Sequence, residues 1–329
     1  MRNWIIAGTG VALLALAGWA GWRHLAAPSA LEPEAMAALY RAPLPAPQGG
    51  MDVFHLGHSL TGRDMPAMVA QLAAAAGIDD HRHHSQLGWG TSLREHWDPD
   101  LPINGFEVEN AHPRYRDAAD ALAEGVEALV LTEMIDLADA IRYHDTPRYL
   151  AEWARAARTA NPEARVYLYE TWHPWTAGDD WLERLEQDDQ ALWADTIRAR
   201  AMALDGVGTV HVIPGGRAMA AFVRTLEAQG GLPGLADRSG LFAYAVDAGV
   251  PDAPEGAIDD IHLNDLGAYL IALVHLATLY QIDPRGLPHA LERHDGTAAD
   301  APSPEAAALM QETVWNVVRQ IPATGVAAE

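Results

Sequence analysis

The sequence contains no cysteine and no lysine. Without cysteine, disulfides, thiolate nucleophiles and thiolate metal ligands are all excluded. All 22 basic residues are arginine, against 45 acidic residues, so the formal net charge is −23. A surface this acidic repels phosphate backbones, which argues against nucleic-acid binding. At 329 residues and 49% hydrophobic content, the chain can build a substantial core, so a disordered chain is excluded as well.

Charge is also missing from a long run near the start of the chain. The stretch "NWIIAGTGVALLALAGWAGW" lies between Arg2 and Arg23 and contains no charged residue. A helix of about twenty apolar residues matches the thickness of a bilayer. The small residues of "LAAPSA" after it would suit a signal peptidase. We therefore expect residues 1–30 to be a signal peptide or an uncleaved membrane anchor. The protein is then exported, either periplasmic or anchored in the inner membrane and facing the periplasm.

The rest of the chain alternates short apolar stretches with amphipathic ones. After a Pro- and Ala-rich linker at residues 31–50, strands are predicted at 51–57, 83–88, 127–133, 164–170 and 208–214. Helices are predicted at 63–76, 115–125, 146–160, 180–204, 215–228, 264–281 and 303–320, with a loop and an irregular segment over 230–258. Short apolar strands separated by helices are typical of a parallel sheet that is buried on both faces. The sequence predicts one three-layer α/β domain over residues 51–322.

The first predicted strand ends at a serine. In "VFHLGHSLTG", Ser59 follows the strand and precedes a predicted helix. Active sites of open α/β sheets gather at the carboxyl ends of the strands, and the free N–H groups at a helix start suit an oxyanion. Ser59 is therefore a candidate nucleophile. The alternative is an ordinary N-cap that only satisfies backbone donors.

A histidine and a carboxylate occur together far downstream. The segment "AIDDIHLNDLGAYLIA" places Asp259 three residues before His262, just ahead of an apolar helix that Asn264 or Asp265 would cap. On a turn, such a carboxylate can orient the imidazole and stabilise the imidazolium that forms when the ring takes a serine proton. The alternative is helix capping beside a solvated histidine.

Together, these two segments resemble the sequence blocks of the SGNH, or GDSL, hydrolase superfamily. "FHLGHSLTG" is similar to the first block, in the branch written Gly-Asn-Ser-Phe-Thr, and "DDIHLNDLG" is similar to the last block, which carries an Asp-x-x-His pair. The resemblance covers about residues 51–281 and implies a parallel, flavodoxin-like sheet of five strands in an α/β/α sandwich. It implies that Ser59 is the nucleophile and His262 the general base and acid. Asp259 would orient His262, with Asp260 as the neighbouring alternative.

The α/β-hydrolase fold is the competing assignment. Its nucleophile lies in Gly-x-Ser-x-Gly, whereas Thr61 stands two positions after Ser59 in this chain. Its serine follows several strands, and its acid and histidine are normally well separated. The sequence therefore favours the SGNH assignment, although His58 stands where that family usually has Asp or Asn.

The resemblance also implies oxyanion donors: the backbone N–H of the nucleophile, a glycine after the second strand and an asparagine after the third. In "LGWGTSLREHW", Gly90 matches that glycine better than Gly88, for which a tight turn with positive φ is the preferred interpretation. After the third strand the chain reads "LTEMIDL", without asparagine. Thr132 or Glu133 lies there instead, and an ionised Glu133 would repel an oxyanion. Asn110 is a further candidate from a loop.

Histidines cluster in "DDHRHHSQ" at the start of the second predicted strand. Strand alternation would send His81 and His83 to one face and His84 to the other. The cluster also lies away from the carboxyl ends of the strands and lacks the spacing of convergent ligands. We expect no metal site there.

Aromatic residues follow the second and fourth predicted strands. Trp172 and His173, in "YETWHPWTAGDDW", and Trp89 are candidates for a wall against which a substrate packs, and Trp175 and Trp97 raise the same question. The alternative is that these rings pack over the core.

These features predict an exported serine esterase that works without a cofactor or a metal. Ser59 would attack an ester carbonyl, and water activated at His262 would hydrolyse the resulting acyl-enzyme. A small acyl group on a carbohydrate, such as acetyl, is the expected substrate, while lipid or aryl esters and transfer to another hydroxyl stay open. The alternative from another class is a catalytically silent SGNH fold that binds envelope glycans. No nucleic-acid partner is expected, and membrane contact is expected only through an uncleaved N-terminal segment.

Overall fold

The computed structural model describes residues 29–328. Most of the predicted signal peptide or anchor, residues 1–30, therefore lies outside the described residues. Within the described range, no helix has both the length and the apolar character needed to cross a bilayer.

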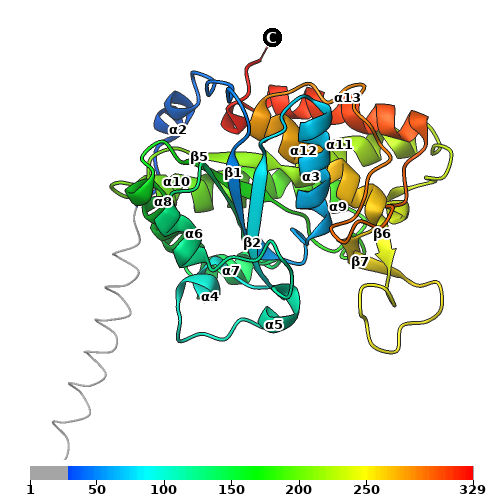
Figure 1. Cartoon of the computed structure of the whole chain (residues 1–329), viewed down its shortest axis with the longest axis horizontal. Helices are drawn as coiled ribbons and strands as arrows, with labels where there is room; N and C mark the ends of the chain where they lie inside the picture. Colours follow the sequence, from blue (N-terminus) through cyan, green and yellow to red (C-terminus); the bar gives the residue numbers. More distant parts are fainter. Residues whose placement is uncertain (1–28, 329) are drawn as a thin grey trace, which may run out of the picture.

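Five parallel strands form the central sheet (Figure 1). They are β1 (Asp52–His58), β2 (Arg82–Gly88), β3 (Ala128–Thr132), β4 (Arg165–Glu170) and β5 (Val210–Pro214). Their order in the sheet is β2-β1-β3-β4-β5, so the direction of winding reverses between β1 and β3. In sheets of this flavodoxin-like order, ligands bind outside the carboxyl ends of the strands at that reversal. The predicted fold class is confirmed, and each predicted strand is present.

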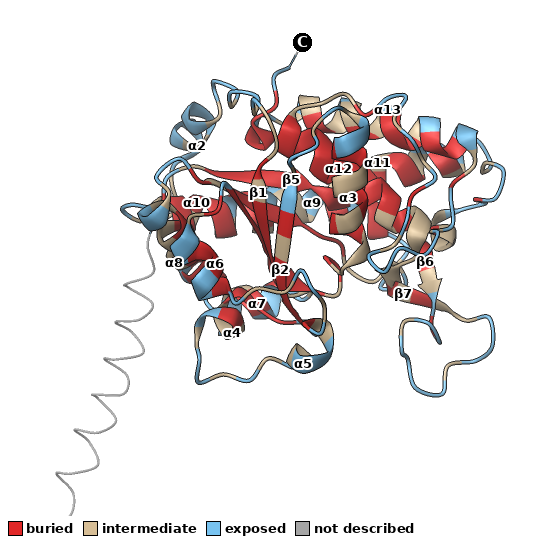
Figure 2. Cartoon of the chain, viewed as in Figure 1, coloured by how far each residue is buried: buried red, intermediate tan, exposed pale blue. Residues whose placement is uncertain are grey.

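The strands alternate their side chains between two buried faces. On β1, Phe54 and Leu56 belong to one apolar cluster and Val53 belongs to the other. The first cluster is covered by α6 (Ala118–Glu124), α8 (Thr146–Ala160) and α10 (Ala199–Met202). The second is covered by α3 (Asp64–Ala75), α11 (Gly215–Ala228), α12 (Asp265–Tyr280) and α13 (Pro304–Gln320). Figure 2 shows the sheet buried between these helical layers.

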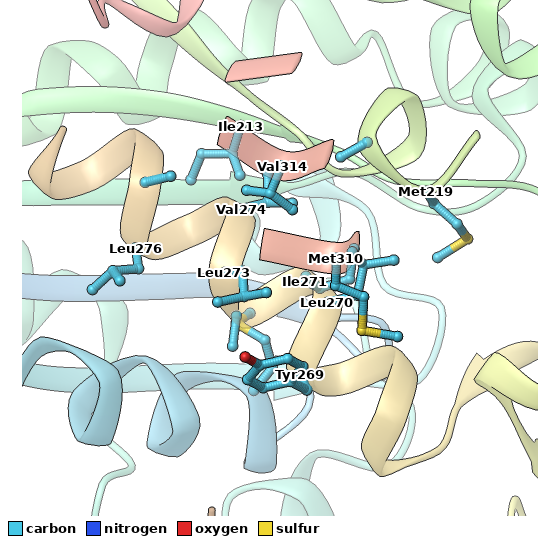
Figure 3. Close-up of a cluster of buried hydrophobic side chains, with 14 of the residues drawn as sticks. Ile213, Met219, Tyr269, Leu270, Ile271, Leu273, Val274, Leu276, Met310 and Val314 are labelled. Carbon is cyan, nitrogen blue, oxygen red and sulfur yellow. The ribbon is translucent and has the colours of Figure 1, made fainter. Parts of the chain in front are cut away.

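Helix α12 lies at the centre of one layer. Every residue from Tyr269 to Tyr280 is buried. Figure 3 shows its apolar side chains beside Ile213 of β5 and next to Met310 and Val314 of α13. A helix that is apolar on all sides is stable only inside a core. Helix α12 is therefore a fixed element to which neighbouring segments are attached.

A two-stranded antiparallel sheet precedes α12. It consists of β6 (Phe242–Tyr244) and β7 (Ile258–Leu263). Asp259 and His262, which the sequence analysis considered as a turn just ahead of the helix, both lie in β7. Residues 258–263 form a strand because they pair with β6, and the local sequence gives no sign of this pairing. Asn264 then caps α12 by accepting two backbone N–H groups of the first turn, so the core helix holds the end of β7.

Three other regions differ from the expected elements. The segment expected to be a linker contains α2 (Pro33–Leu39), and Tyr40 after it donates a hydrogen bond of 2.6 Å to the carbonyl of Val210. The predicted helix at 180–204 is divided into α9 (Trp181–Asp188), a π-helix (Asp189–Arg198) and α10. The loops contain α4 (Leu93–Trp97), α5 (Phe106–Glu109) and α7 (Leu137–Tyr143). These helices are too short to produce a clear helical period in the sequence.

Candidate active site

Ser59 lies in a tight turn at the carboxyl end of β1. The carbonyl of His58 accepts the N–H groups of Thr61 at 2.9 Å and Gly62 at 3.2 Å, which closes the turn. Gly62 has a φ of 58°, a left-handed conformation that glycine adopts without strain. Leu60 is buried and Ser59 is half-buried. The turn is thus anchored by its apolar residue while the serine stays accessible.

The imidazole of His58 ties this turn to the neighbouring strand. The ring is fully buried, and its Nε2–H donates to the carbonyl of Glu133 at 2.8 Å. Its Nδ1 accepts the N–H of Leu60 at 3.4 Å. Burial lowers the pKa of His58 to about 4, so the ring is neutral at neutral pH. His58 therefore braces the serine turn against the end of β3.

Thr132, one of the predicted oxyanion or binding residues, lies beneath the same turn. Its Oγ1 is 2.9 Å from Oγ1 of Thr61, and its side chain is fully buried. A Cβ on Gly57 would lie 2.6 Å from the Cβ of Thr132, so only glycine fits at that position of β1. The hydroxyl of Thr132 is therefore engaged in holding the turn that carries Ser59.

The carboxylate of Asp259 is fixed by its own backbone. Its Oδ1 accepts the N–H of Ile261 at 2.8 Å and that of His262 at 2.6 Å, as in an Asx turn. The same oxygen lies 3.1 Å from Nδ1 of His262. Burial alone would raise the pKa of Asp259, but these backbone hydrogen bonds and the imidazole lower it, so the carboxylate stays ionised. Asp260 instead accepts the hydroxyl of Thr176 at 2.6 Å.

His262 joins this carboxylate to the serine. Its Nε2 lies 3.0 Å from Oγ of Ser59, although 203 positions separate the two residues in the chain. When Nδ1–H is donated to Asp259, Nε2 has no proton and accepts the serine hydroxyl. The three side chains form a continuous hydrogen-bonded chain at the carboxyl edge of the sheet. Such a chain can withdraw the serine proton and hold the resulting imidazolium beside a carboxylate.

Two tryptophans of the loop after β4 support β7. Nε1 of Trp172 donates to the carbonyl of Ile261 at 2.8 Å. Nε1 of Trp175 donates to the carbonyl of Asp259 at 3.1 Å. These bonds fix the backbone that carries Asp259 and His262, a role that sequence analysis did not assign to either ring.

The glycines after β2 differ from the sequence prediction. Gly88 ends β2 without positive φ, and a Cβ there would lie 2.2 Å from Oγ1 of Thr91, so close packing requires this glycine. The positive φ is found at Gly90, at 57°, where a Cβ would meet no atom within 4 Å. No hydrogen bond among residues 29–328 uses the backbone N–H of Gly90 or of Ser59. Both groups are available to bind an oxyanion.

A buried carboxyl group occupies the position after β3. Oε1 of Glu133 accepts the N–H groups of Leu93 at 3.2 Å and Met134 at 2.8 Å. Burial raises the pKa of Glu133 to about 7, although these hydrogen bonds act in the opposite direction. Asn110 donates both amide hydrogens to backbone carbonyls, so it ties α5 to β2 and has no amide hydrogen left for a substrate.

A cavity of about 720 Å³ opens at the same edge of the sheet. The loops after β2, β3 and β4, together with α9 and the π-helix, supply its lining. Gly90, Trp172 and His173 are among the lining residues, and most of the others are apolar: Met134, Ile135, Leu137, Leu185, Leu192 and Trp193. Burial lowers the pKa of His173 to about 4. Trp89 does not line this cavity, because its indole donates to Glu109 of α5 at 2.8 Å and is largely exposed.

The histidines near the start of β2 have separate neighbours. His81 bonds the hydroxyl of Tyr280 at 2.6 Å, and its ring stacks on that of His83. Nε2 of His84 lies 4.0 Å from the carboxylate of Asp52. In the part of the chain that the structure describes, no group of three or more His, Asp or Glu side chains could hold a metal ion.

The braces around Ser59 were missed by sequence analysis. The contacts from His58 to Glu133 and from Thr61 to Thr132 both join β1 to β3. The only sequence signal for them is that His58 and Thr61 stand beside the candidate nucleophile. Their partners become visible only when the two strands are known to be neighbours.

Comparison with known proteins gives two distant likenesses. Neither a protein-family profile nor a curated protein matches the chain. A gut microbial diltiazem-metabolizing enzyme is similar over 72% of this chain, with 11% sequence identity and a TM-score of 0.34. A carbohydrate esterase family 3 structure from Talaromyces cellulolyticus is similar over 70% of this chain and 97% of its own, with 16% identity and a TM-score of 0.32. The chain spans only 48% of the first of these proteins, and neither likeness is close enough to assign an activity.

Proposed function

We propose that the protein is an SGNH-type serine esterase that removes small acyl groups, above all acetyl, from carbohydrate. The observation that carries this proposal is the hydrogen-bonded chain from Asp259 through His262 to Ser59. The charge-free run after Arg2 supports export, with the enzyme in the periplasm or anchored in the inner membrane.

The reaction begins when Oγ of Ser59 attacks the ester carbonyl and its proton moves to Nε2 of His262. The backbone N–H groups of Ser59 and Gly90 stabilise the oxyanion of the tetrahedral intermediate. When this intermediate collapses, the ester C–O bond breaks and His262 donates the proton to the departing alcohol. Water then attacks the acyl-enzyme and gives its proton to His262. The bond from the acyl carbon to Oγ breaks, His262 returns the proton to Oγ of Ser59, and the acid leaves. The ionised Asp259 stabilises the imidazolium in both halves of the reaction.

The cavity at the same edge of the sheet as the triad supports a carbohydrate substrate. Its volume of about 720 Å³ is larger than an acetyl group requires and falls in the range of small-molecule sites. Its lining combines apolar side chains such as Ile135 and Leu192 with the polar Asp136 and His173, so a sugar ring could find both apolar contact and hydrogen-bond partners there.

The proposal is tested with the full chain purified in mild detergent. A panel of chromogenic acetate esters and acetylated sugars is offered to the wild type and to Ser59→Ala. We expect turnover by the wild type and a loss of about 10³-fold or more in the variant. Equal turnover by both proteins, or none on any ester, would overturn the proposal.

Absence of turnover on every ester would favour a catalytically silent fold that binds envelope glycans. The observation behind this second candidate is Glu133, a buried carboxyl group at the strand end where the resemblance calls for an amide donor. Binding of acetylated and deacetylated glycans to Ser59→Ala would then be equal.

A further inference from the structure

A second cavity, of about 530 Å³, lies between α3, the edge strand β2 and the loop at residues 292–296. Figure 1 shows α3 next to β2. Basic side chains dominate the lining: Arg63, Arg114, Arg293, His83, His112 and His294. Glu292 is the one carboxylate among the lining residues that the structure describes. In a chain with a net charge of −23, this is a local reversal of charge.

Two of these arginines have no counter-ion among the residues that the structure describes. Arg293 pairs with Asp265, and Nδ1 of His294 lies 2.6 Å from the carboxylate of Asp64. By contrast, no ion pair or side-chain hydrogen bond of Arg63 or Arg114 occurs within residues 29–328. The cavity therefore carries the uncompensated positive charge of these two guanidinium groups.

Several neutral donors beside these arginines also have no partner. Within the described residues, no hydrogen bond involves the ring of His83 or the hydroxyl of Ser85, which are only 7% and 4% exposed. Nε2 of His112 is buried without a partner. Because buried polar groups are nearly always hydrogen-bonded, the unpartnered Nε2 of His112 indicates a ligand position at this cavity.

The titration of the histidines is consistent with a positive potential at this place. Burial, followed by His81 and Arg114, lowers the pKa of His83 to about 3. Burial, followed by Arg63 and His294, lowers the pKa of His112. Both rings are therefore neutral at neutral pH and can each donate one hydrogen bond.

The cavity begins next to the candidate nucleophile. Gly62 and Arg63 line it, and both belong to the connection that leads from the Ser59 turn into α3. His112 follows α5, whose end is bonded to the last residues of β2 through Asn110. The lining of the cavity therefore reaches the turn that carries Ser59, because Gly62 lies against the backbone carbonyl of Ser59.

We propose that this cavity is a subsite for an anionic group of the substrate. Arg63 and Arg114 bind a carboxylate or phosphate carried by the same molecule as the ester, and His83, Ser85 and His112 donate further hydrogen bonds. Guanidinium groups bind both kinds of oxyanion through paired N–H donors. The substrate class is then an acylated uronic acid or an acylated sugar phosphate. The substrate role rests on the proposed esterase function, whereas the anion site itself does not.

Binding is tested first, on the full chain carrying Ser59→Ala so that no turnover intervenes. Inorganic phosphate is titrated by calorimetry and by NMR of the histidine side chains. We expect the imidazole signals of His83 and His112 to shift, and Arg63→Gln with Arg114→Gln to weaken binding about tenfold or more. Arg148→Gln removes the same kind of charge from an exposed position outside the lining and is the matched control. Absence of phosphate binding, or equal weakening by the control, would overturn the anion site whatever the esterase activity.

Kinetics then test whether the cavity binds an anionic group of the substrate, and whether that group is a carboxylate or a phosphate. Three acetate esters are compared: a methyl glucoside, the matching methyl glucuronoside and the matching glucoside 6-phosphate. We expect at least one anionic ester to be preferred over the neutral one in kcat/KM, and this ratio to fall about tenfold in the double arginine variant but not in Arg148→Gln. Whichever anionic ester has the higher kcat/KM shows whether the cavity binds a uronate carboxylate or a sugar phosphate. An unchanged ratio would overturn the substrate role. Failure of all three esters in the wild type would count against the esterase function, while the phosphate titration would still decide the anion site.

Discussion

Nε2 of His262 lies 3.0 Å from Oγ of Ser59, and the opposite nitrogen of the same ring lies 3.1 Å from Asp259. The ring is therefore oriented from both sides. Asp259 is itself fixed by two backbone N–H groups, and β7 is attached to the core helix α12 through Asn264. The proposed nucleophile and base thus meet without any rearrangement of the fold.

Replacing Asp259 by Asn tests the charge behind the imidazole. The amide oxygen can still accept the N–H groups of Ile261 and His262, so we expect the free energy of unfolding to change little. The imidazolium loses its carboxylate, and kcat should fall about 10³- to 10⁴-fold in the ester assay. Asp260→Asn is the matched control, because Asp260 bonds Thr176 and should leave kcat within about twofold. Equal losses in the two variants would contradict the assigned role of Asp259.

Gly90 offers a test of the oxyanion donors. Gly90→Ala and Gly230→Ala each place a Cβ in open space at a positive φ, 57° and 79° respectively. Both should therefore lower the free energy of unfolding by about 1 kcal/mol. Only Gly90→Ala should lower kcat, by about 10- to 100-fold, because it alone shifts an N–H group that we propose as an oxyanion donor. If kcat is the same in both variants, Gly90 is not a donor.

The buried carboxyl group of Glu133 predicts a pH dependence of stability. Its pKa is raised to about 7 in the fold, so the folded state binds this proton more tightly than the unfolded state. The associated stability is complete below the ordinary carboxyl pKa of about 4.3 and is lost as the pH rises through about 7. Glu133→Gln mimics the protonated form permanently. In urea unfolding the two proteins should differ least near pH 4, and the variant should be more stable by about 1–3 kcal/mol near pH 8. A difference that does not vary with pH would mean that Glu133 titrates normally.

The brace formed by His58 predicts a loss of activity beyond the loss of stability. His58→Ala and His275→Ala each remove a fully buried imidazole that donates to a backbone carbonyl. Both should cost about 2–4 kcal/mol of unfolding free energy. Only His58→Ala frees the turn that carries Ser59, so it alone should lower kcat about tenfold or more with KM little changed. Equal kcat values in the two folded variants would reduce His58 to a packing role.

The long elements could be predicted because their signals are local. Helix α12 is apolar along its whole length and starts at Asn264, whose side chain caps it. Four strands of the central sheet are short, mainly apolar runs, whereas β2 is largely polar and is identified by its position between two helical segments. The contact between Asp259 and His262 could also be predicted, because a carboxylate three residues before a histidine can fold back to the ring, as it does in the Asx turn that Asp259 forms.

Other features depend on contacts between remote segments. The strand conformation of β7 requires β6, and the bond from His58 to Glu133 requires that β1 and β3 be neighbours. The positive φ expected at Gly88 is found at Gly90 instead, and Gly88 is required by its approach to Thr91 and Ile103, which no local pattern reveals.

Labelling with a fluorophosphonate tests the central claim most directly. An activated serine attacks the phosphorus, fluoride leaves, and a stable phosphonyl ester remains on Oγ. Peptide mapping by mass spectrometry of the full chain should find the adduct on Ser59, and no adduct in Ser59→Ala or His262→Ala. An adduct on another residue, or a folded wild-type protein that stays unlabelled, would contradict the account.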